Sequence, residues 1–250
     1  MSGHSKWASI KHKKAAVDAK RGAHFTKLAR AIQVAAREGG GDPGMNASLA
    51  NAVQKAKDAR MPKDNIERAI AKGTGAGSDA DAFESVMYEG YGPGGVALLV
   101  EALTDNRNRT GSEVRHMFAK SGGNLGEPGS VAWQFEKKGI LVVDAERFSE
   151  DDVMPAIEAG AEDIADDEGV WEIVTAPADL TAVREALEAA NIELDSAEQT
   201  MRPTTRVQVD EATVGKLMRL IEQLEDDDDV AAVHANFDVD AEVLERVAAA

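Results

Sequence analysis

The sequence predicts a multidomain protein in which a small all-α region precedes a longer α+β region. Up to residue 72, apolar residues recur at intervals of three and four, which is typical of amphipathic helices. Residues 74–81 are small, polar and glycine-rich, as in a flexible linker. Beyond residue 82, runs of Val, Leu, Met and Tyr alternate with helical stretches, which indicates α+β domains.

We expect three helices in the first region. The first begins near residue 15 and ends at the glycines before Asp42, where the sequence turns. Asn46 is expected to cap the second helix, because its side chain can accept from a backbone N–H of the first turn. Pro62 opens the third helix and Gly73 closes it. The sequence therefore predicts a helical domain over residues 1–73 and a linker over residues 74–81.

In the second region the glycine-rich Gly90–Gly95 segment is expected to join two strands, because an apolar run follows it where a phosphate-binding loop needs a helix. The Glu-Lys-Lys-Gly sequence at 136–139 predicts the turn of a hairpin. Strands are expected at 84–89, 96–102, 131–135, 140–143, near 163, and at 170–175, 195–201, 206–209 and 230–237. Helices are expected at 110–119, 150–159, 180–190 and 211–224, with a short helix in the tail.

Charge is distributed very unevenly along the chain. Residues 1–72 hold 15 Lys and Arg against 6 Asp and Glu, whereas the remaining residues hold 13 against 39. The first part therefore carries +9 and the rest −26, within a total of −17. Binding of a polyanion depends on the local potential within about 8 Å at physiological salt, so the acidic total does not exclude nucleic acid as a partner.

The basic arm and first helix are the strongest functional candidates, because each Lys or Arg that meets a phosphate releases condensed counterions. A solvated helix face, with a basic tail that docks on the acidic body, is the alternative interpretation. A second, weaker patch follows a predicted strand, where Thr110 or Ser112 is expected to cap a helix. The candidate phosphate contacts are Lys6, Lys11, Lys13, Lys14, Lys20, Arg21, Lys27 and Arg30, with Arg107 and Arg109 in the second patch.

Other chemistry has little support in the sequence. The chain has no Cys, which excludes disulfides, thiolate catalysis and Cys-ligated zinc. His4, His12 and His24 do not have the spacing of common metal sites, and Asp226–Asp229 is interpreted as a solvated turn. No catalytic arrangement is evident, so we expect a non-enzymatic protein without metal or cofactor.

No apolar run approaches the roughly 20 residues that span a bilayer, and no uninterrupted apolar segment follows the basic N-terminus. We therefore expect no membrane partner and no secretory signal peptide, and a cytoplasmic location. No feature of the sequence indicates a small-molecule substrate or an oligomeric state.

Several long motifs resemble the YebC/PmpR family of bacterial proteins, usually described as transcriptional regulators. Its mitochondrial relative is the translational activator of cytochrome c oxidase. The resemblance covers essentially the whole chain and weakens in the acidic second half; differences such as Ser9 and Ala23 are conservative. The motifs are GHSKWASIKHKKAAVDAKRGAHFTKLARAI, NASLANAVQKAKDARMPKDNIERAI, YEGYGPGGVALLVEALTDNRNRT and SGGNLGEPGSVAWQF.

The resemblance implies three domains, with an N-terminal helical domain followed by two α+β domains of which the third is inserted into the second. Mapped onto this chain, residues 82–130 and 204–238 would form the second domain, residues 131–203 an acidic third domain, and residues 239–250 a tail. It also implies a DNA-binding transcriptional regulator. The alternative is a ribosome-associated translation factor that binds ribosomal RNA and aids synthesis through difficult stretches such as consecutive prolines.

Overall fold

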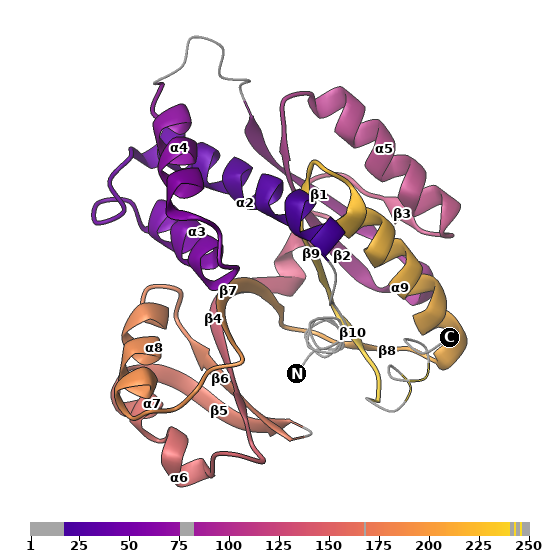
Figure 1. Ribbon diagram of the computed structural model, residues 1–250. Helices are drawn as coiled ribbons and strands as arrows, with labels where there is room; N and C mark the ends of the chain where they lie inside the picture. The colour runs from indigo at the N-terminus through magenta and orange to yellow at the C-terminus, as the bar shows by residue number, and fades with distance from the viewer. Residues whose placement is uncertain (1–17, 76–82, 168, 241–242, 244–245, 247–250) are drawn as a thin grey trace.

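The computed structural model describes residues 18–75, 83–167, 169–240, 243 and 246. It contains an N-terminal helical region and two four-stranded antiparallel sheets, so the predicted class is confirmed (Figure 1). Most of the predicted linker and of the predicted tail lies outside the described residues. The boundaries of the three expected domains stay a prediction.

The helical region comprises α2 (Asp18–Gly39), α3 (Ala47–Asp58) and α4 (Lys63–Gly73). Asn46 caps α3 as predicted, accepting from the Leu49 N–H at 3.1 Å. The Asn46 amide also donates to the carbonyls of Ala35 and Gly40, at 2.7 and 2.9 Å, which fixes the end of α2 against the start of α3. Apolar faces of the three helices meet in one core around Ile32 and Leu49.

The first sheet has the order β3-β1-β2-β9, and one face is covered by α5 (Arg107–Lys120) and α9 (Glu211–Asp226). As expected, the glycine-rich segment joins two strands, through the short helix η1 (Pro93–Gly95). Asn106 caps α5 at 3.1 Å from the Arg109 N–H, so the expected cap at Thr110 or Ser112 is wrong. The strands are β1 (Glu84–Tyr91), β2 (Ala97–Thr104), β3 (Asn124–Leu125) and β9 (Val230–Ala235).

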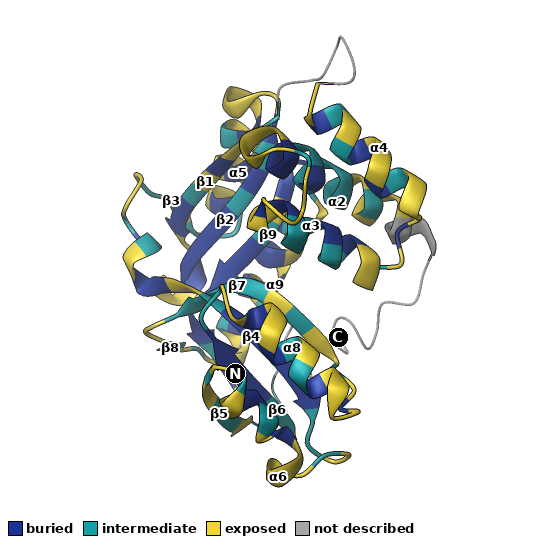
Figure 2. Cartoon of the chain, turned by 90° about the vertical axis from the view of Figure 1, so that its left-hand side faces the viewer, coloured by how far each residue is buried: buried dark blue, intermediate teal, exposed yellow. Residues whose placement is uncertain are grey.

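The second sheet has the order β5-β6-β4-β7. The chain leaves the first sheet after β3, builds the second, and returns through α9 to place β9 beside β2. Figure 2 shows that buried residues concentrate in β2 of the first sheet and in β4 and β6 of the second, whereas β5 and β7 contain none. The strands are β4 (Phe135–Asp144), β5 (Ala161–Asp167), β6 (Val170–Thr175) and β7 (Ser196–Pro203), and α6 (Glu150–Val153), α7 (Pro155–Glu158) and α8 (Leu180–Ala189) accompany them. Two smaller strands, β8 (Val207–Gln208) and β10 (Phe237–Asp238), pair in parallel, and the short helix η2 (Ala132–Gln134) precedes β4.

Three predictions in this region are wrong. The strand expected at 131–135 is instead the short helix η2, and of these residues only Phe135 belongs to a strand. The hairpin expected around residues 136–139 is one continuous strand, β4, because these residues pair with residues 199–202 of β7. The helix expected at 150–159 is two short helices, α6 and α7, since Pro155 has no N–H to continue the hydrogen bonding of the first.

Candidate nucleic-acid interface

The cationic side of α2 faces an acidic turn. This acidic turn, residues 225–229, comprises the last two residues of α9 and the connection to β9. Lys27 and Arg30 are three residues apart and so project from the same side of the helix. The Lys27 ammonium donates to the Glu225 carbonyl at 2.5 Å. Arg30 donates to the Asp228 carbonyl at 2.6 Å and to Asp229 Oδ1 at 2.9 Å. Both predicted phosphate contacts are therefore engaged within the chain.

Lys27 is partly withdrawn from solvent by this contact. Burial lowers the pKa of Lys27, and the surrounding carboxylates Asp227, Asp228, Glu225 and Asp226 act in the opposite direction without cancelling it. The acids thus compensate only in part for the lost hydration of the ammonium.

Asp229, the last residue of the acidic turn, is only 5% exposed. Its Oδ1 pairs with Arg30, and its Oδ2 accepts from Arg109, Thr110 and Thr104 at 2.6, 2.7 and 3.1 Å. Burial by itself raises the pKa of Asp229, but these hydrogen bonds outweigh burial and hold the pKa below its usual range. The prediction of a solvated turn is therefore wrong for Asp229.

The second predicted patch is divided between two environments. Arg109 bonds Asp229 and also Asp105 Oδ1 at 2.9 Å, and hydrogen bonds to these two carboxylates raise the pKa of Arg109. Arg107 is exposed and lies 3.6 Å from a carboxylate oxygen of Glu84. Both arginines are exposed, but of the two only Arg109 is bound to the acidic turn.

The remaining predicted contacts cannot be placed in the same way. Lys6, Lys11, Lys13 and Lys14 lie outside the described residues. Lys20 and Arg21 belong to the first turn of α2, of which only the backbone is described. Their part in binding stays a prediction.

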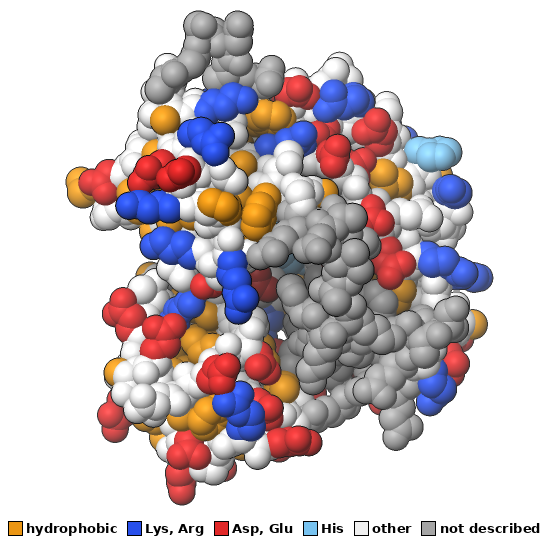
Figure 3. Space-filling view, in the orientation of Figure 1, with side chains coloured by type: hydrophobic (Ala, Val, Ile, Leu, Met, Phe, Trp, Pro, Cys, Tyr) orange, Lys and Arg blue, Asp and Glu red, His pale blue; other side chains and the backbone are white. Residues whose placement is uncertain are grey.

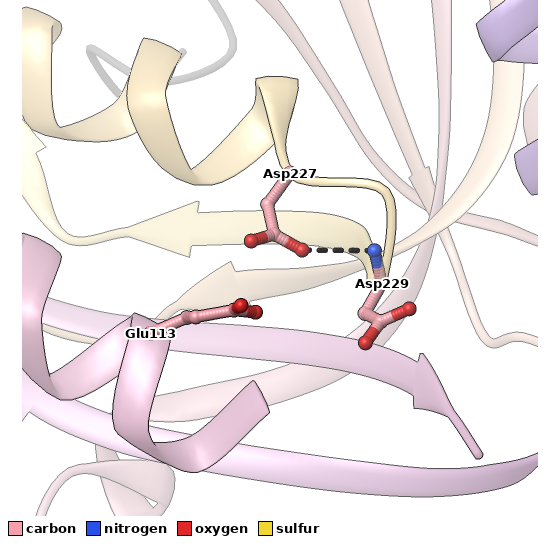
Figure 4. Close-up of side chains that lie close together, drawn as sticks. All are labelled: Glu113, Asp227 and Asp229. Carbon is pink, nitrogen blue, oxygen red and sulfur yellow. Dashed lines mark hydrogen bonds between the residues drawn. The ribbon is translucent and has the colours of Figure 1, made fainter. Parts of the chain in front are cut away.

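Two carboxylates of the acidic turn and one from α5 lie close together. Glu113, Asp227 and Asp229 offer oxygen atoms within 4.8 Å of one another (Figure 4). However, the Asp227 carboxylate accepts from the Asp229 N–H at 2.9 Å, and both Asp229 oxygens already bind arginine. The nearby guanidinium groups supply the positive charge that a metal ion would bring.

Sequence reasoning missed the partner of the α2 cations and two further cations, Arg68 and Lys72, on α4. An acidic run directly after a helix was the available signal for the first. For Arg68 and Lys72 the signal was their spacing of four, which places both on one side of α4. Figure 3 shows Lys and Arg side chains gathered over α3 and α4.

Comparison with known proteins identifies the family. Residues 5–76 match the description "TACO1/YebC protein N-terminal domain", and residues 83–237 match "TACO1/YebC second and third domain". The chain belongs to the TACO1/YebC family. The resemblance stated from the sequence motifs is thereby confirmed.

Close relatives extend over the full length of the chain. A probable transcriptional regulatory protein of Rubrobacter xylanophilus is 57% identical over 249 residues, covering 99% of this chain and all of the relative. One from Desulfotalea psychrophila is 55% identical over 250 residues, with the same coverage.

Among solved structures, a conserved hypothetical protein of Aquifex aeolicus is 51% identical. It has a TM-score of 0.81 and covers 92% of this chain and 96% of its own. Within the described part of the TACO1/YebC chain, no helix has the length and apolar character needed to cross a membrane.

Proposed function

We propose that this protein is a non-enzymatic regulator of gene expression that binds DNA through its basic N-terminal residues and acts in the cytoplasm. The observation that carries this proposal is the charge asymmetry, +9 over residues 1–72 against −26 over the rest. The names of the relatives, probable transcriptional regulatory proteins, support a role in transcription.

The candidate cations differ in whether they are bound to the acidic turn. Lys27, Arg30 and Arg109 must leave the acidic turn before they reach a phosphate. Of the described candidates, only Arg107 is not bound to the acidic turn, so we propose it for first contact. We propose the basic residues at the start of the chain on their charge: Lys6, Lys11, Lys13, Lys14, Lys20 and Arg21.

A salt titration of duplex DNA binding tests this proposal. The logarithm of the affinity should fall linearly with the logarithm of salt concentration, by about 0.9 per phosphate contact. Replacing Lys11, Lys13 and Lys14 by Ala should reduce that slope by about 2 to 3. The control variant, Arg115, Lys120 and Lys216 to Ala, removes the same charge from the α+β part and should leave the slope unchanged. Affinity that does not depend on salt, or an unchanged slope in the Lys11 variant, would contradict the proposal.

A second candidate is a ribosome-associated translation factor, and the acidity of the second sheet favours it. Four of the seven residues in β5 are acidic, Glu162, Asp163, Asp166 and Asp167. Such a surface is repelled by a duplex lying along it, but it can project away from an RNA to which only the basic region binds. Sedimentation with ribosomes, compared with retention on promoter fragments in the same extract, distinguishes the two candidates.

A further inference from the structure

A solvent-open groove of about 400 Å³ lies between α2 and α4, beside the residue that leads into β1. Its volume falls in the range of roughly 300–1,000 Å³ that is usual for ligand sites. The side chains come from both helices and from the segments that flank them. The described lining residues are Phe25, Thr26, Ala29, Arg30, Gln33, Met61, Asn65, Arg68, Ala69, Lys72 and Phe83.

Part of this lining is apolar and aromatic. Met61 and Ala69 are buried, and Phe25 and Phe83 are half-buried. Arg30 stacks its guanidinium over the Phe83 ring, 4.9 Å from the centroid, while its N–H groups hold the acidic turn. These contacts therefore hold Arg30 in place in the groove lining, and Phe25, also on α2, adds a second aromatic ring to that lining.

The α4 side of the groove is cationic. Arg68 and Lys72 are four residues apart and so lie on one face of the helix. Arg68 donates to the Asp64 carbonyl at 3.1 Å and to the Asn65 side chain at 2.5 Å, which directs its guanidinium along this face. Neither Arg68 nor Lys72 forms an ion pair with a residue that the structure describes.

No Asp or Glu occurs among the described lining residues, although the chain as a whole carries −17. Cations next to a half-buried aromatic ring in the lining of one groove, without a carboxylate, complement a nucleotide, which combines a phosphate with a base that can stack. A duplex keeps its bases stacked inside and offers only its phosphates to such a surface. The aromatic lining therefore favours an unpaired strand.

We propose that this groove holds an unpaired nucleotide of a DNA or RNA strand, with the base against Phe25 and the phosphates at Arg68 and Lys72. The inference rests on the proposed function, because it gives the nucleic-acid-binding region a site that selects single strands.

Fluorescence anisotropy with labelled single-stranded DNA, single-stranded RNA and duplex DNA of one sequence tests the proposal on the full chain. The double variant Arg68→Gln/Lys72→Gln should bind both single strands at least about 10-fold more weakly. Phe25→Leu keeps apolar packing against the helical core and should weaken single-strand binding about 5-fold, with a smaller effect on duplex. Comparing the two single strands shows which of them the groove prefers.

The matched control is Lys57→Gln/Lys63→Gln, which removes two exposed charges from the same helical region. Lys63 lies about half a turn of α4 away from the groove face. Equal losses in the control and groove variants would overturn the groove while leaving the proposed function intact. A wild-type chain that binds none of the three probes would overturn both. Thermal unfolding of each variant confirms that lost binding is not lost folding.

Discussion

Glu89 shows how a single buried carboxylate holds a loop of this protein. It is 6% exposed, and its oxygens accept from the backbone N–H groups of Gly129, Val131 and Ala132 at 2.6, 2.8 and 2.8 Å. Burial by itself raises the pKa of Glu89, but the three N–H donors outweigh burial and leave the pKa below its usual range. The loop between β3 and β4 is thus fastened to β1 by one charge.

Replacing Glu89 by Gln should lower the free energy of unfolding by about 2 kcal/mol, because the amide presents an N–H₂ group to donors that need acceptors. Glu127→Gln, at a position in the same loop, should change it by less than about 0.5 kcal/mol. Urea unfolding at pH 7 measures both. Equal effects would show that the three hydrogen bonds do not stabilise the fold.

Wild type and Glu89→Gln also test how the stability contributed by Glu89 depends on pH. The pKa of Glu89 is lower in the folded than in the unfolded chain, where it is about 4.3. Its stabilising contribution is therefore complete above about pH 4.3 and is lost as the pH falls through the folded pKa. The difference in stability between wild type and Glu89→Gln should accordingly shrink below about pH 4.

At the scale of the elements, β4 shows why the turn that the local sequence predicts at residues 136–139 does not form. Glu-Lys-Lys-Gly is a good turn sequence, yet these residues extend along β7 because the pairing from Phe135 to Val142 is continuous. Gly139 is needed for close approach: a Cβ there would collide with the Thr175 side chain and come within 3.0 Å of Leu180 Cβ. The glycine that suggested a turn thus allows α8 to pack on the sheet.

Gly139→Ala should therefore lower stability by about 1–3 kcal/mol, the usual cost of overpacking. At Gly215, inside α9, a Cβ would meet no atom within 4 Å apart from its chain neighbours and the backbone of its own helix. Gly215→Ala should raise stability by about 0.5–1 kcal/mol, because Ala has the higher helix propensity. Thermal unfolding of the two variants should shift in opposite directions; shifts in the same direction would contradict close packing around Gly139.

At the scale of the whole molecule, charge pairs hold the helical region against both sheets. Arg30 binds the acidic turn of the first sheet, and Arg184 of α8 binds both Asp58 oxygens at 3.0 Å. Burial raises the pKa of Asp58, but the hydrogen bonds from Arg184 and Gln54 outweigh it and lower the pKa overall. The acidic turn itself occupies Lys27 and Arg30, two cations that a phosphate would also bind.

If the acidic turn competes with nucleic acid for these cations, removing its charge should strengthen binding. Asp226→Asn/Asp228→Asn takes two carboxylates away from Lys27, near which both lie. We expect a roughly 2- to 5-fold higher affinity for nucleic acid at low salt, and a smaller gain at high salt. Anisotropy titrations measure this gain.

Glu158→Gln/Glu185→Gln removes the same charge from positions around the second sheet and serves as the control. An equal gain in the control would mean that only the total charge matters. No gain in either variant would show that the acidic turn does not compete.

The sequence by itself determined the class of the fold, the Asn46 cap and the charge asymmetry, because these depend on neighbouring residues and simple counts. The tertiary structure decided which cations are engaged within the chain. Arg30 and Asp229 are 199 positions apart, and no local pattern reports that α2 meets the acidic turn.

The same reason applies to β4 and to the groove. Residues 136–139 become a strand because β7, which follows much later in the chain, supplies the hydrogen-bond partners. Phe25 and Arg68 line one groove because the packing of α2 on α4 places them together. Local preference is worth a fraction of a kcal/mol per residue, so long-range pairing and burial overrule it wherever the two disagree.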